Sequence, residues 1–220
     1  MEFRDVVRRR RMVRAYDPSR PVPQETVERI ARHAQRAPSA GYSQGWGFLF
    51  LTEQADRDRF WAATDLDPSD PNAGTAAAAG LAEWRAGMMT APLIVVAHSC
   101  KDVYLDRYAR DDKGWSDRAE DRWPVPYWDV DTGMAALLVL LTAVDEGLGA
   151  CLFGIMPGEI PRYRAEFGVP DSYTPVGAIT VGYPAPSDAR LTPERKASFQ
   201  ERKRPVEDVV HYGQWKTARE

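Results

Sequence analysis

The sequence contains few of the residues that most enzymes use for thiol, metal or histidine chemistry. Among its 220 residues there are two cysteines and three histidines. Cys100 and Cys151 lie far apart with no metal-ligand spacing around them, which indicates buried thiols in a reducing compartment. His33 falls on the polar face of an expected helix. His98 ends an expected strand, where a hydrogen-bonded core histidine is the simplest interpretation.

Familiar catalytic motifs are missing as well. The chain has no HExxH, CxxC, GxSxG or P-loop sequence, and no GxGxxG that would indicate a dinucleotide-binding βαβ unit. Asp65, Asp67 and Asp70 are spaced somewhat like a calcium loop, but Pro71 interrupts the pattern and the closing Glu is absent. We expect a solvated turn at these residues and no bound metal.

The chain also lacks a strong excess of one charge and a long apolar segment. Its formal net charge is −3, so no overall positive field would hold a nucleic acid. Residues 1–14 carry charges where a secretory signal needs an apolar stretch. The longest apolar run, residues 133–144, is too short to span a bilayer. We therefore expect a cytoplasmic protein without nucleic-acid or membrane partners.

What the sequence does contain is an ordinary mixture of helix and strand patterns. Hydrophobic residues make up 44% of the chain, enough to bury a core in one domain over residues 1–220. The patterns predict a short first helix, helices over 25–37, 54–63, 76–90, 129–146 and 157–167, and strands over 47–52, 93–97, 150–153 and 175–183. Helices and strands mix without strict alternation, which favours an α+β fold or a three-layer α/β/α sandwich.

Two segments do not fit these patterns. Residues 99–128 interleave aromatic side chains with charges and prolines and show no clean period, which is typical of a lid over a ligand. These aromatic side chains could stack on an aromatic substrate or pack against a second subunit, and the sequence leaves both possibilities open. Residues 184–220 are polar and are expected to form a C-terminal extension.

Six arginines lie between Arg4 and Arg14. Such a run is usually a solvated face or a surface for acidic partners. Arginine, however, also offers a planar fork that matches phosphate oxygens, and a phosphate dianion needs several such donors when it is taken out of water. Phosphate binding is therefore the more specific hypothesis for this segment.

Residues 37–46 form a second unusual segment, rich in small residues. Proline, serine and glycine there are compatible with a plain turn. Ser39, Ala40 and Gly41 have little bulk, so their backbone amides could also meet the edge of a planar ring. Together with the arginine run, this loop suggests a flavin mononucleotide (FMN) site and a redox protein.

Four motifs resemble the nitroreductase-like FMN-dependent oxidoreductases across residues 3–215. Residues 10–14 (RRMVR) are similar to the family's RRSVR, and residues 37–46 (APSAGYSQGW) to its APSxxNxQPW. Residues 147–154 (GLGACLFG) are similar to GLGTCWxG, and residues 203–211 (KRPVEDVVH) to a closing RKPLxxxVH. Each motif alone is modest, but four of them in this order and at these separations are specific.

The resemblance implies a fold and an assembly. The fold would be a mostly antiparallel central sheet with helices on both faces. The chain would form a homodimer in which both subunits contribute to each of two FMN sites, with the C-terminal tail reaching the partner subunit.

The resemblance also implies the residues of the site, with no catalytic side chain because the cofactor performs the hydride transfer. The phosphate end of FMN would be held from the arginine motif and the tail by Arg10, Arg11, Met12, Arg14, Lys203 and Arg204. The flavin ring would be contacted by Ser39, Ala40, Leu152, Phe153 and Gly154, with a backbone N–H near the flavin N5. The substrate would be bordered by Gly41 and Tyr42. From the aromatic segment 99–128, Tyr104 and Tyr108 are the candidates for contact with the substrate.

The implied activity is hydride transfer from NAD(P)H through FMN to a small acceptor of aromatic, quinone or nitro type, by a ping-pong route. Alternatives are another flavin reaction on the same fold, such as dehalogenation, natural-product dehydrogenation or flavin fragmentation, and flavin sequestration without turnover. Met12 stands where the family has serine, and Tyr42 where it has asparagine. The Tyr42 ring would lie near the substrate entrance, so acceptor preference stays open, as does the choice between NADH and NADPH.

Overall fold

The computed structural model describes residues 1–65, 76–186, 188 and 193–215. The predicted loop over 65–75 lies almost wholly outside them. The chain divides into two units, Met1–Asp188 and Ala189–Glu220. In its described part the second unit contains helix α8 (Pro193–Glu201) and a short 3₁₀ turn (Val206–Asp208). The sheet and both hydrophobic cores belong to the first unit.

The sheet of the first unit has four strands, and every neighbouring pair is antiparallel. In spatial order the strands are β1 (Trp46–Leu51), β2 (Leu93–Ser99), β4 (Thr174–Gly182) and β3 (Gly149–Phe153). All seven residues of β2 are buried. A strand buried on both sides requires a helical layer on each face of the sheet. This leaves β1 and β3 as the two edges of the sheet.

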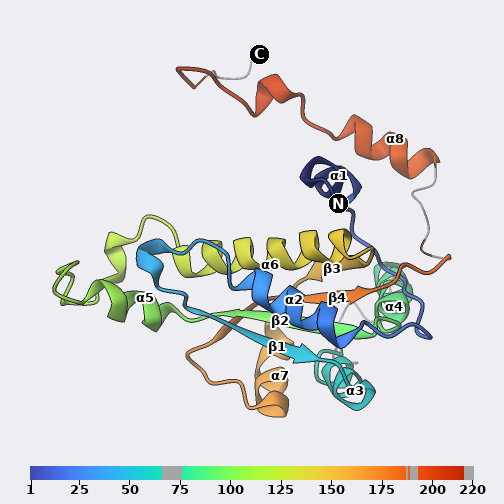
Figure 1. The fold of residues 1–220 in the computed structure, drawn as a ribbon, viewed down its shortest axis with the longest axis horizontal. Helices are drawn as coiled ribbons and strands as arrows, with labels where there is room; N and C mark the ends of the chain where they lie inside the picture. Colours follow the sequence, from blue (N-terminus) through green and yellow to red (C-terminus); the bar gives the residue numbers. More distant parts are fainter. Residues whose placement is uncertain (66–75, 187, 189–192, 216–220) are drawn as a thin grey trace. The chain divides into compact units, whose positions relative to one another are not determined.

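Helices supply both layers (Figure 1). In the first unit they are α1 (Phe3–Arg9), α2 (Gln24–Ala34), α3 (Gln54–Ala63), α4 (Ala76–Met88), α5 (Lys101–Tyr108), α6 (Tyr127–Asp145) and α7 (Ile160–Phe167). Side chains alternate along β2, so Leu93 and Val95 enter a core shared with α2 and α6. Ile94 and Val96 enter the opposite core, shared with α3, α4 and α7.

This architecture confirms the predicted α+β fold with an antiparallel sheet between helical layers. The predicted helix ends differ by a few residues. Helix α2 ends at Ala34 rather than at residue 37, because the N–H groups of Arg36 and Ala37 donate to carbonyls three residues back and so leave the α-helical pattern. Helix α6 begins at Tyr127, directly after Pro126, two residues earlier than predicted. The segment 99–128, which shows no period, nevertheless contains helix α5.

Helix α6 is the one described helix that is long and apolar enough to cross a membrane by length and composition alone. Half of that apolar stretch is buried inside the fold. Its buried face packs on α2 and on the sheet through Ala136, Val139 and Ala143. These contacts are those of a core helix, and they account for the apolar residues on its buried face.

His98 is a hydrogen-bonded core histidine, as predicted. Its Nε2 lies 2.9 Å from the hydroxyl of Tyr163, and its Nδ1 lies 3.3 Å from the carbonyl oxygen of Gly47. Burial raises the pKa of the Tyr163 hydroxyl, so this group stays protonated and donates to Nε2. Nδ1 then carries the ring proton and donates to Gly47. Burial also lowers the pKa of His98, because the imidazolium form would lose its hydration.

The lowered pKa of His98 predicts acid-sensitive stability. The unfolded chain takes up this proton near its ordinary pKa of about 6.5, whereas the folded chain resists it to lower pH. The free energy of unfolding is therefore fully retained above about pH 7 and falls as the pH drops below about 6.5. Urea unfolding at pH 8 and pH 5.5 measures the difference. His98→Gln should reduce it, whereas His33→Gln, a change at an exposed histidine, should preserve it. An equal pH response in both variants would contradict the assignment.

Candidate functional site

The arginine motif forms an extended strip that leaves α1 and lies against β3. Met12 bridges Ala150 in parallel orientation, and the Val13 N–H donates to the Ala150 carbonyl over 3.0 Å. Val13 is buried directly over Gly149, where an added Cβ would stand 2.4 Å from Val13 Cγ2. The glycine of the third motif therefore makes room for the first motif, which explains why two distant sequence signals meet at this edge.

Asp188 anchors the strip by its charge. Its Oδ1 accepts a 2.9 Å hydrogen bond from the Arg14 N–H, and its Oδ2 pairs with the Arg11 guanidinium. The Asp188 side chain is almost completely buried. Arg11 is therefore already neutralised within the chain. Among the described residues, the guanidinium groups of Arg10 and Arg14 form no salt bridge, so they remain available to an anion.

The third motif offers its backbone to a ligand more than its side chains. Leu152 packs against the core on the α2 and α6 side. Phe153 points to the opposite core, where its ring stacks on Trp61 at a centroid distance of 5.7 Å. Both side chains are therefore turned toward the cores. A predicted contact with a flavin ring would have to be made by the main-chain groups of these two residues. Gly154 follows them at the exposed end of the strand.

Both cysteines are free and buried, as the sequence predicts. Burial raises the pKa of the Cys151 thiol, and the nearby positive charge of Arg14 partly opposes this shift. A thiol with a raised pKa is a poor nucleophile at neutral pH. Cys151 is thus a packing residue of β3 beneath the arginine strip.

The small-residue loop lies at the other edge of the sheet, where it leads into β1. Ala40–Tyr42 forms a 3₁₀ turn, and Gly41, Tyr42 and Gln44 have positive φ angles of 60°, 54° and 55°. For non-glycine residues such angles cost roughly 1–3 kcal/mol each and persist only where surrounding contacts impose them. Tyr42 is 80% exposed, so its own packing does not hold it in this conformation.

Side chains of α5 and α6 hold the loop. The Ala40 N–H donates to Asp131 Oδ2 over 2.8 Å, and Arg107 Nε donates to the Gly41 carbonyl over 2.9 Å. The Ala40 N–H therefore points into the protein in this conformation, and the predicted contact of this loop with a ring edge stays a prediction. Sequence reasoning missed Asp131 and Arg107, which no local motif marks.

The aromatic side chains of the 99–128 segment and the start of α6 pack on one another. Ring contacts with centroid distances of 4.6–6.3 Å connect Tyr104, Tyr108, Trp115, Trp123, Tyr127 and Trp128. Tyr104 is fully buried, and its hydroxyl donates to Asp131. Tyr104 therefore supports the loop from the interior of the protein and does not present a surface to a substrate. Tyr108 is partly exposed beside Gly41.

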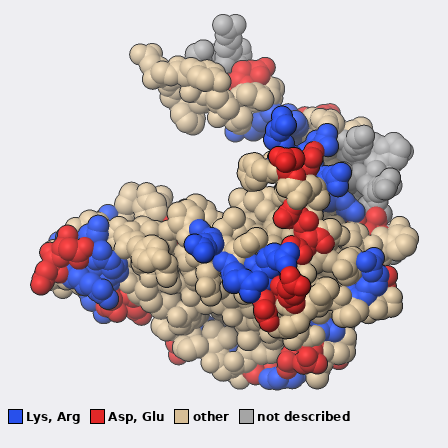
Figure 2. Space-filling view, in the orientation of Figure 1, with Lys and Arg blue, Asp and Glu red and all other residues tan. Residues whose placement is uncertain are grey.

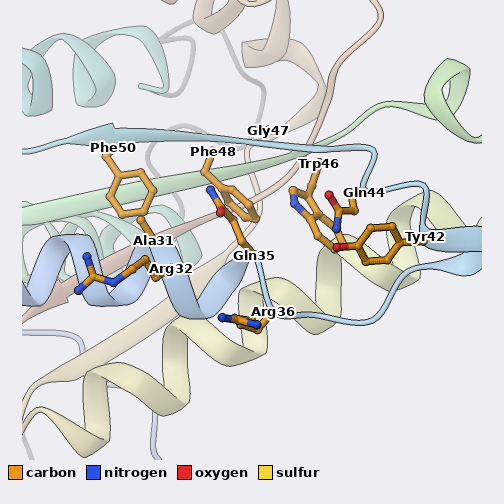
Figure 3. Close-up of a pocket in the computed structure, with 10 residues that line it drawn as sticks. All are labelled: Ala31, Arg32, Gln35, Arg36, Tyr42, Gln44, Trp46, Gly47, Phe48 and Phe50. Atoms are coloured by element: carbon orange, nitrogen blue, oxygen red, sulfur yellow. The ribbon is translucent and has the colours of Figure 1, made fainter.

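A groove that sequence reasoning missed runs between α2 and the edge strand β1 (Figure 3). It has a volume of about 690 Å³. Trp46, Phe48 and Phe50 point into it from alternate positions of β1, Arg32 borders it from α2, and Arg36 borders it from the segment just after α2. Aromatic residues at every second position of an edge strand are the signal that could have revealed it. Tyr42 and Gln44 extend the groove toward the loop.

Charges on the face that carries α2 are mixed (Figure 2). Arg29 pairs with Glu25 and Glu146, and Arg32 with Glu28. Such pairs neutralise the helix surface locally, so this face offers no continuous cationic track of the kind that a nucleic acid requires. Within the described residues, no group of three or more His, Cys, Asp and Glu side chains is arranged to hold a metal ion.

The predicted flavin and substrate residues thus fall into two groups. The strip group, comprising residues 10–14 and 152–154, lies along the β3 edge. The loop group, comprising residues 39–42 with Tyr104 and Tyr108, lies at the β1 edge. Two strands separate these edges, which puts them about 14 Å apart. Lys203 and Arg204 belong to the second unit of the chain.

Comparison with known proteins identifies this arrangement. The model of the nitroreductase family matches residues 7–183. The chain belongs to the nitroreductase family. An Archaeoglobus fulgidus protein named "Putative NADH dehydrogenase/NAD(P)H nitroreductase" is 26% identical over 194 residues, covering 84% of this chain and 91% of that protein. The matched residues contain the first three of the four motifs, which explains why these three occur in order along one chain.

Solved structures show the same fold. A nitroreductase family protein from Clostridium difficile 630 has a TM-score of 0.65 at 21% identity, covering 98% of this chain and 100% of that one. A structure from Staphylococcus epidermidis, named "putative NAD(P)H:FMN oxidoreductase", has a TM-score of 0.64 at 19% identity, covering 96% and 95% of the two chains. At these identities the likeness establishes the nitroreductase fold.

The close approach of Val13 to Gly149 predicts a sharp difference between two glycine substitutions. Gly149→Ala forces a methyl group into the Val13 side chain and should lower the free energy of unfolding by about 1–3 kcal/mol. Gly154→Ala is the matched control, because nothing lies within 4 Å of its added Cβ. Chemical denaturation of both variants checks the prediction. Equal stabilities would show that the strip does not depend on a glycine at this point.

Proposed function

We propose that this protein is an FMN-dependent oxidoreductase that takes hydride from NAD(P)H and delivers it to a small-molecule acceptor. The observation that carries the proposal is the strip along β3 of a nitroreductase-family chain, where Arg10 and Arg14 keep guanidinium groups free of salt bridges among the described residues. A phosphate is the anion that best matches two arginine forks beside exposed backbone.

The residues of the strip fit the phosphate end of FMN. Arg10 and Arg14 would bind the phosphate oxygens, while Arg11, held by Asp188, would fix the strip rather than the ligand. Met12 is bridged to β3 and would contribute backbone only. That Lys203 and Arg204 contact the phosphate stays a prediction. Within the tail, Arg204 Nη2 donates to the Asp208 carbonyl over 2.6 Å.

The exposed end of β3 fits the ring end of the cofactor. Gly154 has no side chain to block a planar ring, and the preceding strand residues present main-chain groups there. FMN, when bound, would supply the hydride chemistry at N5. Because the donor and the acceptor would use one site in turn, the expected kinetics are ping-pong. The printed names of the Archaeoglobus and Staphylococcus relatives support NAD(P)H and FMN as the reactants.

We further propose a homodimer in which the strip group of one subunit and the loop group of the other form each site. The two groups lie at opposite edges of the sheet in a single chain, which supports assembly from two copies.

Helix α6 also presents an apolar stripe. Val130 is 44% and Leu137 47% exposed, and Met134 and Leu141 are half-buried on the same face. In the tail, Tyr212 and Trp215 are more than 80% exposed. Such side chains favour burial against a partner subunit.

Other flavin reactions of the fold remain the competing proposal, together with flavin sequestration. Anaerobic titration distinguishes them, because an NAD(P)H oxidoreductase is bleached by the nucleotide before any acceptor is added. A yellow protein that neither NADH nor NADPH bleaches would favour another donor or a storage role.

The FMN proposal predicts that purified protein binds FMN and that Arg10→Ala weakens the affinity. Loss of a charge-assisted hydrogen bond to phosphate costs roughly 1.5–3 kcal/mol, or about tenfold to a hundredfold in Kd. Quenching of FMN fluorescence during titration measures the affinity. Arg8→Ala is the control, because Arg8 pairs with Asp5 on α1, outside the strip. A protein that takes up no FMN would refute the cofactor, and unchanged affinity in Arg10→Ala would remove that residue from the site.

The dimer proposal predicts that a charge in the α6 stripe separates the subunits. Leu137→Glu should shift the protein from dimer to monomer in sedimentation velocity, and it should also weaken FMN binding, because each site would lose one contributing subunit. Leu81→Glu is the matched control on α4, where the original side chain is 38% exposed. A wild-type protein that sediments as a monomer would contradict the shared site.

A further inference from the structure

Asp131 is a buried carboxylate that joins two segments distant in sequence. It lies in the second turn of α6 and is 2% exposed. Its Oδ2 accepts the N–H of Ala40 and the hydroxyl of Tyr104, both over 2.8 Å. The loop before β1 and helix α5 are thus fixed to one oxygen atom. Hydrogen bonds to an ionised acceptor are stronger than those between neutral groups.

Packing alone does not explain this carboxylate. Burying a charged group is unfavourable unless hydrogen bonds compensate it, and an apolar side chain would fill the same space without that cost. Asp131 forms no salt bridge with any described residue, so its two donors carry the compensation. Burial and the bond to Asp131 raise the pKa of the Tyr104 hydroxyl, which therefore stays protonated and keeps donating.

Helix α5 also fits the loop closely at two glycines. A Cβ added to Gly41 would stand 2.7 Å from the Tyr108 ring, and one added to Gly45 would stand 2.6 Å from the Tyr104 ring. Arg107 of the same helix binds the Gly41 carbonyl. The loop therefore lies on a surface formed by one face of α5, and Asp131 connects both to α6.

We infer that Asp131 is a positioning residue, which holds loop 39–45 on α5 and so sets where the exposed Tyr42 stands. Tyr42 has a positive φ and little packing of its own, so its orientation depends on the anchored residues on either side. Changes in Tyr104 would then alter acceptor binding through the loop and not by contact. The anchoring of the loop does not depend on the proposed function. Only its effect on acceptor binding rests on that function.

Hydrogen exchange in protein free of FMN tests the anchoring directly. Asp131→Ala and Tyr104→Phe should each accelerate amide exchange in residues 39–45, by about tenfold for Asp131→Ala, while exchange in the core of α6 stays unchanged. Asp129→Ala is the matched control: this carboxylate lies two residues earlier on α6 and accepts from Ser99 of β2 over 2.5 Å. It should leave loop exchange as in the wild type.

Three outcomes would overturn the inference: unchanged loop exchange in both variants, equal acceleration in Asp129→Ala, or acceleration spread evenly over the whole sheet. Tyr104→Phe removes only a hydroxyl, so it still provides the test if Asp131→Ala fails to fold. In FMN-loaded protein, the same variants should raise the acceptor KM more than they lower kcat. The hydrogen-exchange experiment needs no flavin. Its result would therefore still test the anchoring if the proposed function were wrong.

Discussion

A sheet that is buried on both faces can present functional groups only at its edges and ends. Every residue of β2 is buried, and alternate residues feed two separate cores. Helices must therefore cover both faces, and ligands are excluded from the centre of the sheet. The arginine strip lies along the β3 edge, and the small-residue loop and aromatic groove lie at the β1 edge. This constraint decides where chemistry can occur in the chain.

In the proposed function, the two edges would carry complementary halves of a flavin site. One edge offers guanidinium groups and exposed backbone, and the other offers a turn of small residues beside Tyr42. A single copy holds these halves apart, so the proposed dimer is a consequence of the sheet topology as much as of the apolar stripe on α6. The tail, with its exposed Tyr212 and Trp215, is a further surface that a second copy could cover.

At each edge of the sheet, a different buried carboxylate holds the neighbouring segment by accepting hydrogen bonds. Asp188 holds the strip through Arg11 and the Arg14 amide. Asp131 holds the loop through the Ala40 amide and Tyr104. In each case the hydrogen bonds that the carboxylate accepts compensate for its burial. The same bonds order a segment that lacks regular secondary structure. The aromatic side chains of 99–128 add to this order by packing on one another.

Local patterns in the sequence determined the elements, the fold class and the motifs of the family, because helix and strand periods and glycine or proline signals depend on neighbouring residues. The pairing of distant groups was decided only by the tertiary structure. The Ala40 amide and Asp131 are 91 positions apart, and the Arg14 amide and Asp188 are 174 positions apart. No local period records such contacts. For the same reason the sequence did not indicate that Tyr104 is fully buried and that the Phe153 ring packs on Trp61. Burial depends on how strands and helices from the whole chain come together.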